Sequence, residues 1–437
     1  MDETLGRLPV EPVDDLTKTF KRFLHIEAMA GVVLLFCTIV ALALSNSPWS
    51  TPYHSFWDMR AGFWLGDLEF SRSLKHWIND GWMTLFFFLV ALELKREMVM
   101  GELRNWHTAA LSFAGALGGM VAPASVFLLL MRGGAGWHGW GTVMSTDTAF
   151  VIGCLAVLSS RIPQSLRLFL LSLAIFDDIG AILVIAFGYG GVLNWTALAL
   201  AALGVAVVVL IALLGIRNVP IYSAMGGFVW LAFDASGIHP TIAGVILGLL
   251  TPARSWVSDD RLHAILDRVS AYPRGEHWSG DTMDRKDLRR ANIATREALS
   301  PVERLEIALH PWVAFVIVPA FALANAGVPL FSTQVNTSLT LAIFFGFVLG
   351  KPMGVVLFSY LTVRFRWAKL PPELDWKLIF FGAVLTGIGF TMALLIAELA
   401  FEPSLLNSAK LGVLAASIVS ATLGLSALRW LTSSKAA

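Results

Sequence analysis

The amino-acid sequence predicts an all-α polytopic membrane protein with about twelve transmembrane helices. Its 437 residues are 56% hydrophobic and only 14% charged, a balance that points to lipid as the solvent. The apolar residues also form long runs without Asp, Glu, Lys or Arg, each long enough for a helix to cross a bilayer. These runs are residues 28–57, 105–131, 179–216, 307–350, 378–397 and 411–428. The composition argues against a soluble or disordered protein, and we expect no nucleic-acid partner.

Charges, Pro/Gly clusters and polar turns divide the chain into twelve expected spans. They are residues 25–45, 74–95, 107–131, 139–158, 164–187, 193–216, 219–233, 237–251, 305–327, 338–362, 376–398 and 408–428. The seventh and eighth are the shortest, so a single bent or re-entrant pair is an alternative there. An even number of spans puts both termini on one side, which then holds most of the 32 Lys and Arg residues. Because basic loops stay in the cytoplasm, we expect both termini there.

Segments outside the spans differ in character. Residues 46–73 mix aromatic residues with Gly and polar residues, which favours a small outer hairpin or an interfacial belt. Residues 256–300 carry many charges of both signs and indicate a cytoplasmic insert, disordered or partly helical. The expected organisation is therefore a cytoplasmic tail at 1–24, spans 1–8 within 25–255, the insert at 256–300, spans 9–12 within 301–430, and a second cytoplasmic tail at 431–437.

Four ionisable residues lie deep inside expected spans, where charge is costly and usually functional. Asp177 and Asp178 are adjacent in the fifth span, Asp147 is in the fourth, and Lys351 is in the tenth. Adjacent helical residues diverge by about 100°, so the two neighbouring aspartates need different surroundings. Lys351 is the expected partner of Asp177; the alternative is a purely structural ion pair that locks two helices together.

Oxygen-bearing side chains dominate this region. Small hard cations prefer oxygen ligands, so Asp178, Asp177 and the Thr146 hydroxyl, with carbonyls freed by a broken helix, are expected to bind Na⁺ or Li⁺. Asp147 would compensate the charge of helix ends. Residues 141–150 and 172–184, which hold the three aspartates, contain no Cys or His, which argues against a transition-metal site. We expect no cofactor besides the transported ions.

Spans four and eleven are both rich in small and polar residues. GTVMSTDTAF, which begins at Gly141, aligns with GAVLTGIGFT, which begins at Gly382, at four positions. The two segments are seven spans apart, so they would run in opposite directions across the membrane. This pattern predicts an inverted repeat with two discontinuous helices, spans 4 and 11, that cross at the midplane. The alternative is that small residues only allow close helix packing.

Several motifs match one family in its own order. They are STDTAF with Thr146 and Asp147, AIFDDIGAI with Asp177 and Asp178, GKPMG with Lys351, FFFLVALELKRE, GIHPTIAGVILG and RLEIALHPWVAF. At these residues the chain resembles the NhaA-type sodium/proton antiporter family over nearly its whole length. That family is itself a standard example of an inverted-repeat transporter, so the repeat and the resemblance are not independent. The resemblance implies twelve helices with inverted three-helix repeats in spans 3–5 and 10–12.

The resemblance also implies a role for each site residue. Asp178 would be the principal carboxylate for ions and protons, Asp177 the second, and Lys351 its partner, with Asp147 and Thr146 supporting the crossing. The positions where the family places pH-response residues are Glu93, Arg96, Glu97, His239 and Glu306. The alternatives are a capping or packing role for His239 and ordinary interfacial charge for residues 93–97. The insert at 256–300 is longer and more charged than the family suggests.

The implied function is secondary active transport and not enzymatic catalysis. The protein would exchange cytoplasmic Na⁺ or Li⁺ for external protons, electrogenically and with pH regulation, in the inner membrane of a bacterium. Its expected partners are Na⁺, Li⁺, H⁺, membrane lipid and a second copy bound through residues 46–73. The paired aspartates resemble those of the electrogenic branch, which moves more protons than sodium ions per cycle.

Two other functions fit a polytopic protein with buried carboxylates. An intramembrane aspartyl protease would use two aspartates on different helices, here Asp147 with Asp177 or Asp178, but it has no use for Lys351. A cation channel would need a filter-like segment, and none is evident in the sequence.

Overall fold

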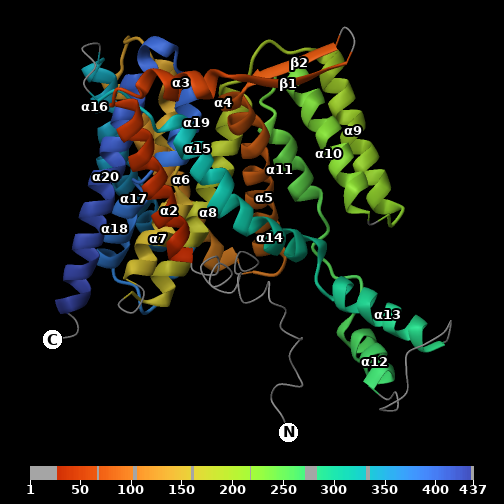
Figure 1. The fold of residues 1–437 in the computed structure, drawn as a ribbon. Coiled ribbons are helices and arrows are strands. Elements are labelled where there is room, and N and C mark those ends of the chain that lie inside the picture. Colours follow the sequence, from red (N-terminus) through yellow and green to blue (C-terminus); the bar gives the residue numbers. More distant parts are fainter. Residues whose placement is uncertain are drawn as a thin grey trace. The chain divides into compact units, whose positions relative to one another are not determined.

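The computed structural model describes residues 27–65, 68–101, 106–158, 162–216, 218–270, 283–330 and 335–434. The predicted tail at 1–24 lies outside these residues, as do residues 435–437. The described chain is almost entirely helical, with one two-stranded sheet (Figure 1). It divides into two compact units. Unit 1 comprises Met1–Met83, Asn105–Val192 and Pro311–Ala437, and unit 2 comprises Thr84–Arg104 and Leu193–His310.

Unit 1 contains most of the elements. They are α2 (Glu27–Ser45), α3 (Ser50–Asp58), β1 (Arg60–Leu65), β2 (Leu68–Ser73), α4 (Leu74–His76), the π-helical turn η2 (Trp77–Trp82), α6 (Trp106–Leu130), the 3₁₀ helix η4 (Trp137–Val143), α7 (Thr148–Val157), α8 (Gln164–Gly188), the π-helical η5 (Val313–Ile317), α15 (Val318–Asn325), α16 (Thr337–Phe345), the π-helical η6 (Gly346–Gly350), α17 (Lys351–Arg364), α18 (Trp376–Leu385), α19 (Phe390–Ala400) and α20 (Pro403–Ser434). Unit 2 contains nearly all of α5 (Met83–Val99), with α9 (Trp195–Leu213), α10 (Val219–Ser236), α11 (Thr241–Leu250), α12 (Asp259–Ser270), α13 (Met283–Ala298) and most of α14 (Pro301–Trp312).

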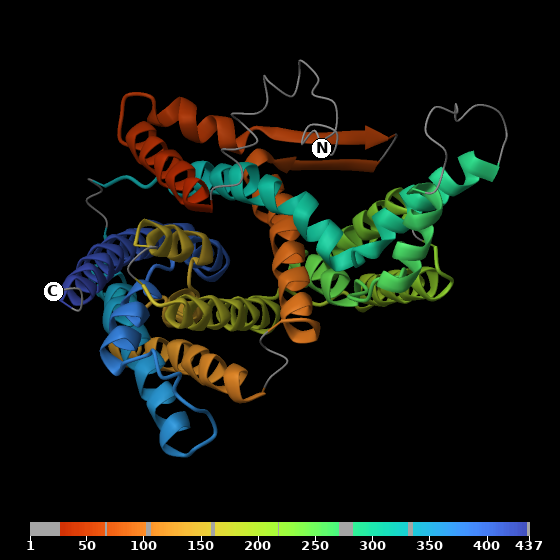
Figure 2. The ribbon, with the colours of Figure 1, turned by 90° about the horizontal axis from the view of Figure 1, so that it is seen from below.

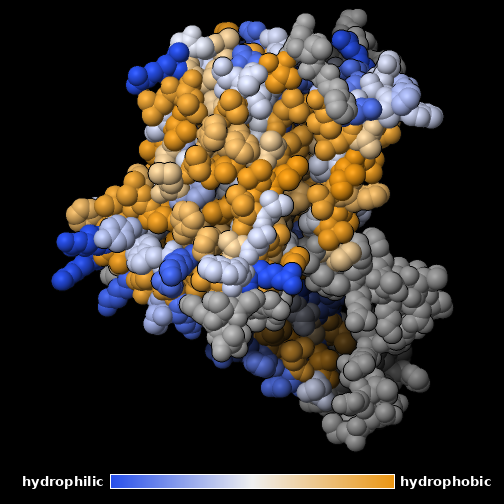
Figure 3. All heavy atoms as spheres, turned by 90° about the vertical axis from the view of Figure 1, so that its left-hand side faces the viewer, coloured by the Kyte–Doolittle hydropathy of each residue, from blue (hydrophilic) through white to orange (hydrophobic). Residues whose placement is uncertain are grey.

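Within the described residues, eight helical stretches are long and apolar enough to cross a membrane, or up to ten if each of two bent helix pairs is one span. Exposed apolar side chains on these helices include Phe36, Leu129 and Ile418. Figure 3 shows apolar residues covering a broad face with hydrophilic residues at its margins, as a lipid-facing surface requires. A mostly helical, multi-pass membrane protein is therefore confirmed, whereas the total of about twelve spans stays a prediction.

The backbones of α6 and α17 approach each other closely at two glycines in the interior of unit 1. A Cβ on Gly118 would lie 2.1 Å from the Gly354 carbonyl oxygen, and one on Gly354 would lie 2.0 Å from that of Gly118. Only glycine fits at both positions, as is common where membrane helices cross closely. Lys351, the first residue of α17, is thereby held beside α6 with a fully buried side chain.

Two helix breaks meet inside unit 1. Residues 144–147 separate η4 from α7, and residues 386–389 separate α18 from α19 with a bend of 53°. The amide of Asp147 donates a hydrogen bond to the carbonyl of Ile388 at 2.7 Å, so the breaks are in direct contact. The continuous helix α8 contacts η4, α7, α18 and α19, which brings its middle next to both breaks.

The segment at 46–73 contains α3 and an antiparallel hairpin of β1 and β2, in which Gly62 pairs with Ser71. A Cβ on Gly62 would lie 2.1 Å from the Phe70 carbonyl oxygen, so this position also requires glycine. An isolated two-stranded hairpin is only marginally stable. Here the Trp77 indole Nε1 donates to the Ala61 carbonyl at 2.8 Å and ties the hairpin to η2.

In unit 2, α9 and α10 lie side by side (Figure 2) over a small apolar core that includes Ala201, Val229 and Ala243. Gly237 ends α10 in the left-handed conformation, at φ 84°, as glycine commonly does at helix ends. Helix α14 begins with a capping box, because Ser300 Oγ accepts from the Glu303 amide and Glu303 Oε2 accepts from the Ser300 amide. The charged insert contains α12 and α13.

Candidate ion-binding site

Helix α8 carries two adjacent buried carboxylates. Asp177 is fully buried and Asp178 is 4% exposed. Their side chains diverge around the helix axis, so each meets a different group. Asp177 Oδ2 is 2.8 Å from Lys351 Nζ, and Asp178 Oδ2 accepts a hydrogen bond from Thr148 Oγ1 at 3.1 Å.

Lys351 and Thr146 surround the Asp177 carboxylate. The ammonium of Lys351 also donates to the Met144 carbonyl. Thr146 Oγ1 is 2.5 Å from Asp177 Oδ2 and 3.1 Å from the Thr386 carbonyl oxygen. Since all three side chains are fully buried, loss of one member of the ion pair would leave an uncompensated charge, at a cost of about 3–5 kcal/mol. The structure therefore brings together three of the five predicted ion-site residues.

The carboxylate of Asp147 points to a different set of partners. Its Oδ1 accepts from the Phe150 amide at 3.1 Å and caps α7. Its Oδ2 accepts from the amide and the hydroxyl of Thr391, at 2.9 and 2.5 Å, in the first turn of α19. One negative charge thus faces the positive N-terminal ends of two helices.

The C-terminal ends of η4 and α18 are contacted by Lys351 and Thr146. Met144 follows the C-terminal end of η4, and Thr386 follows that of α18. Their carbonyls contact Lys351 and Thr146, respectively. Carbonyl ends of helices carry partial negative charge, so the Lys351 ammonium compensates the C-terminal end of η4, whereas the Thr146 hydroxyl satisfies the carbonyl at the end of α18.

Buried oxygen atoms without a hydrogen-bond partner in the described part of the chain lie on α8 and on the segment that leads to Thr146. Asp177 Oδ1 and the hydroxyls of Thr142 and Ser145 are buried and have no hydrogen-bond partner among the described residues. Buried oxygens normally have partners. Carboxylate and hydroxyl oxygens are the donor atoms that a small hard cation takes, so the residues present suit an alkali cation as cargo.

The predicted pH-response residues lie in unit 2. Arg96 contacts two of them: its Nη2 is 3.1 Å from Glu97 Oε1, and its Nη1 forms an ion pair with Glu306 Oε1. Glu93 lies one turn earlier on α5. The ring of His239 hydrogen-bonds through Nδ1 to Thr241 Oγ1 at 2.7 Å, just before α11, a local contact of the kind that a capping or packing histidine makes.

Sequence reasoning did not predict the ionic or hydrogen-bond contacts of three further residues in unit 1. The hydroxyl of Thr148 donates to Asp178, and that of Thr391 donates to Asp147. In the sequence, these contacts could have been suspected because Thr148 follows an aspartate and Thr391 follows a glycine-rich segment. Glu398 Oε1 is 2.7 Å from Lys75 Nζ and 2.5 Å from Lys410 Nζ. An acidic residue in an otherwise apolar segment was the signal for that network.

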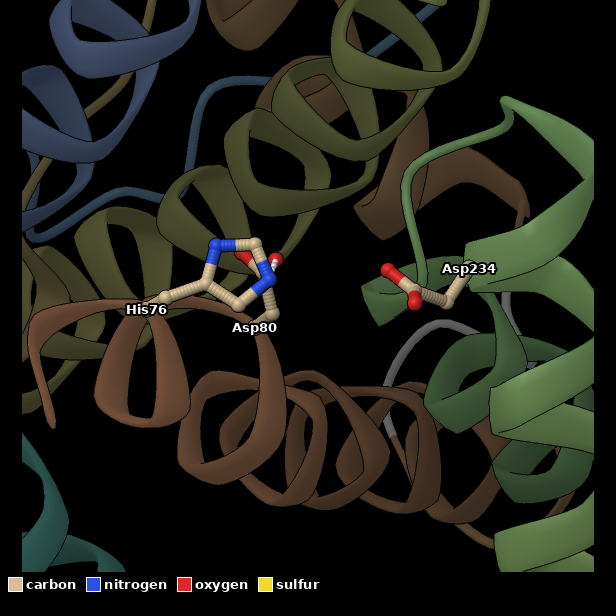
Figure 4. Close-up of side chains that lie close together, drawn as sticks. All are labelled: His76, Asp80 and Asp234. Atoms are coloured by element: carbon tan, nitrogen blue, oxygen red, sulfur yellow. Dashed lines mark ion pairs between the residues drawn. The ribbon is translucent and has the colours of Figure 1, made fainter. Parts of the chain in front are cut away.

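A further ionisable pair in unit 1 is local. His76 Nε2 is 2.8 Å from Asp80 Oδ2, one helical turn along the chain (Figure 4). Such i, i+4 contacts stabilise a helical segment.

The contacts disfavour an aspartyl protease. Its two aspartates must share a site so that one carboxyl can activate water beside the other. Here Asp147 is bonded to α7 and α19, whereas Asp177 is paired with Lys351. Broken helices in contact beside a buried Asp–Lys pair, within a multi-pass helical protein, instead define the class of secondary transporters.

The chain belongs to the family described as Na+/H+ antiporter 1, whose model matches residues 21–428. It is 65% identical over 433 residues to the Na(+)/H(+) antiporter NhaA of Rhizobium meliloti (strain 1021), covering 99% of each chain. It is 54% identical over 426 residues to Na(+)/H(+) antiporter NhaA 2 of Vibrio vulnificus (strain CMCP6), covering 98% of this chain and 95% of that one. The sequence-based recognition of the NhaA family is therefore confirmed.

A solved structure has a similar fold. The sodium proton antiporter MjNhaP1 from Methanocaldococcus jannaschii, determined at pH 8, aligns with a TM-score of 0.50 over 96% of this chain and 94% of that chain, at 13% identity. At that identity the similarity concerns the fold alone.

Proposed function

We propose that this protein is an electrogenic antiporter that exchanges cytoplasmic Na⁺ or Li⁺ for external protons, with both ions competing for Asp177 and Asp178. The observation that carries this proposal is the buried contact of Asp177 with Lys351 and Thr146 beside the two helix breaks. A carboxylate that holds either a proton or a metal cation couples the two ions, provided that the site changes sides only when loaded.

Lys351 keeps the empty site electrically balanced. With no cation bound, its ammonium neutralises Asp177 at 2.8 Å. An entering Na⁺ competes with this ammonium for the same carboxylate, so binding of the cation releases Lys351 from the pair. The second proton of each cycle is then carried either by Asp177 or by the Lys351 amine.

The charge moved per cycle follows from two protons entering for one Na⁺ leaving. At a membrane potential of about 100 mV, negative inside, the net charge is worth roughly 2.3 kcal/mol. The potential would therefore drive Na⁺ outward even when the pH gradient is small.

The rest of the proposal concerns topology and regulation. Helices α6, η4–α7 and α8 would form one three-helix repeat, and α16–α17, α18–α19 and α20 its inverted copy, within about twelve spans. Both termini would lie in the cytoplasm and the protein in the bacterial inner membrane, with lipid around its apolar surface.

The ion pairs of Arg96 with Glu97 and Glu306 would mediate pH regulation, with Glu93 and His239 as further candidates. Residues 46–73, which include the β1–β2 hairpin, would form the interface of a homodimer.

The test is Na⁺-induced proton movement in sealed proteoliposomes containing a pH-sensitive dye, with and without a valinomycin-imposed potential. We expect exchange that is faster when the potential is negative on the side to which protons move. Lys351→Gln discriminates the two proton carriers: if the amine is the second carrier, the variant exchanges one proton per Na⁺ and loses its voltage dependence. Wild-type exchange that is indifferent to the potential would refute the electrogenic mechanism.

A further inference from the structure

Three consecutive residues divide their side chains between two helices. The backbone of Asp147 is extended, at φ −85° and ψ 98°, and alternate side chains of an extended chain point the same way. Thr146 and Thr148 accordingly both face α8, where they contact Asp177 and Asp178, whereas the carboxylate of Asp147 reaches α19. Each aspartate of the pair is thus matched to one threonine.

We propose that the Thr148 hydroxyl is a further ligand of the transported alkali cation, an inference that rests on the proposed function. Thr148 Oγ1 lies 3.1 Å from Asp178 Oδ2, in the same relation as Thr146 Oγ1 to Asp177 Oδ2 at 2.5 Å. A hydroxyl that donates its proton to a carboxylate keeps both lone pairs. These lone pairs are available to a cation held by that carboxylate.

A second observation points to a cation at this place. Asp177 Oδ1 is fully buried and has no hydrogen-bond partner among the described residues, so the cluster holds acceptor capacity that its own donors do not use. Residues 146–148 and α8 supply an oxygen-only set in two neighbouring pairs, Thr146 with Asp177 and Thr148 with Asp178. Small hard cations select such a set, and neutral hydroxyls let the site distinguish cations by size without adding charge.

Three variants separate ligation from packing. Thr148→Val keeps the branched shape and removes the hydroxyl, Thr148→Ala removes both, and Thr148→Ser keeps the hydroxyl. Thr38→Val is the matched control, because Thr38 is a buried threonine whose hydroxyl bonds to the Leu34 carbonyl of its own helix α2 at 2.7 Å. Each protein is first checked for a monodisperse elution profile in detergent.

The measurements are the KM for Na⁺ and for Li⁺ in proteoliposome exchange and the Kd for each cation by calorimetry on purified protein. We expect Thr148→Val and Thr148→Ala to raise both constants by roughly tenfold or more, as loss of a contact to a charged group implies. The maximal rate should be retained, Thr148→Ser should stay close to wild type, and Thr38→Val should be unchanged. The ratio of the Na⁺ and Li⁺ constants should also change in Thr148→Val.

The outcomes separate this inference from the proposed function. If wild type exchanges Na⁺ for protons and both hydroxyl-free variants keep wild-type KM and Kd, Thr148 is not a ligand although the antiport mechanism stands. A fall in maximal rate at unchanged KM would assign Thr148 a packing role and also overturn the inference. If wild-type protein shows no exchange at all, the proposed function fails, and calorimetry of the same variants still decides whether Thr148 binds the cation.

Discussion

Asp147 and Thr391 join two helix starts that are far apart in the sequence. Oδ2 of Asp147 accepts both the amide and the hydroxyl of Thr391, at 2.9 and 2.5 Å, while Oδ1 caps α7. One carboxylate therefore satisfies amides at two N-terminal ends and neutralises part of the positive charge of both. The carbonyl ends on the other side are faced by Lys351 and Thr146. The crossing is thus held by polar contacts, each of which can be removed individually.

The Asp147–Thr391 contact should contribute measurably to stability. We expect Thr391→Val and Asp147→Ala each to lower the free energy of unfolding by about 1–3 kcal/mol, because each leaves buried polar groups unpaired. The double variant should lose clearly less than the sum of the two, since residues in one contact are coupled. Thermal or denaturant unfolding in detergent measures all three. Strictly additive losses would contradict a direct contact.

Asp178→Asn should abolish Na⁺-dependent proton exchange and Na⁺ binding while the protein remains folded. The amide keeps the shape of the side chain but cannot carry a proton or neutralise a cation. Asp177→Asn should be nearly as severe if Asp177 also carries a proton. The readouts are dye-monitored exchange in proteoliposomes and calorimetric Na⁺ titration, with the exposed Asp58→Asn as control. A well-folded Asp178→Asn variant with near-normal exchange would remove this residue from the mechanism.

Glu306→Gln should alter the pH dependence of exchange. The substitution removes the titratable group that pairs with Arg96, so the charge of this cluster no longer changes with pH at that position. We expect the pH of half-maximal rate to move by roughly one unit, which corresponds to about 1.4 kcal/mol. The matched control is Glu297→Gln, which breaks the pair of Glu297 with Arg304 at 2.8 Å in the same unit. Equal pH profiles for both variants and wild type would exclude Glu306 as a pH-response residue.

Shortening the hairpin should weaken a homodimer and spare transport. Replacing residues 62–71 by Asn-Gly keeps the Ala61–Arg72 pair and closes it with a favourable two-residue turn. Light scattering in mild detergent should show a dimer for wild type and a larger monomer fraction for the variant, at equal exchange rates. A wild type that is monomeric at all concentrations tested would count against this interface.

The sequence by itself determined the class of protein and the main charged partners. Long apolar runs separated by charged segments indicate spanning helices. In a bilayer core, the backbone N–H and C=O groups of such a run find their hydrogen-bond partners within the helix itself. Lys351 was identifiable as the partner of Asp177 because no other basic residue lies as deep in an expected span, and the structure places them 2.8 Å apart. Asp147 was singled out in the same way, by its position among apolar residues.

Tertiary structure decided which oxygen contacts which. The sequence does not show that the chain is extended at Asp147, and this conformation sends Thr146 and Thr148 to α8 and Asp147 to Thr391. The pairs Arg96–Glu306 and Lys75–Glu398 join residues 210 and 323 positions apart. A local pattern constrains only which face of its own helix a side chain occupies. Contacts at such separations depend on the geometry with which helices cross. In this protein that geometry depends on close glycine contacts between helices and on the two helix breaks, whose bends depend on residues far away in the sequence.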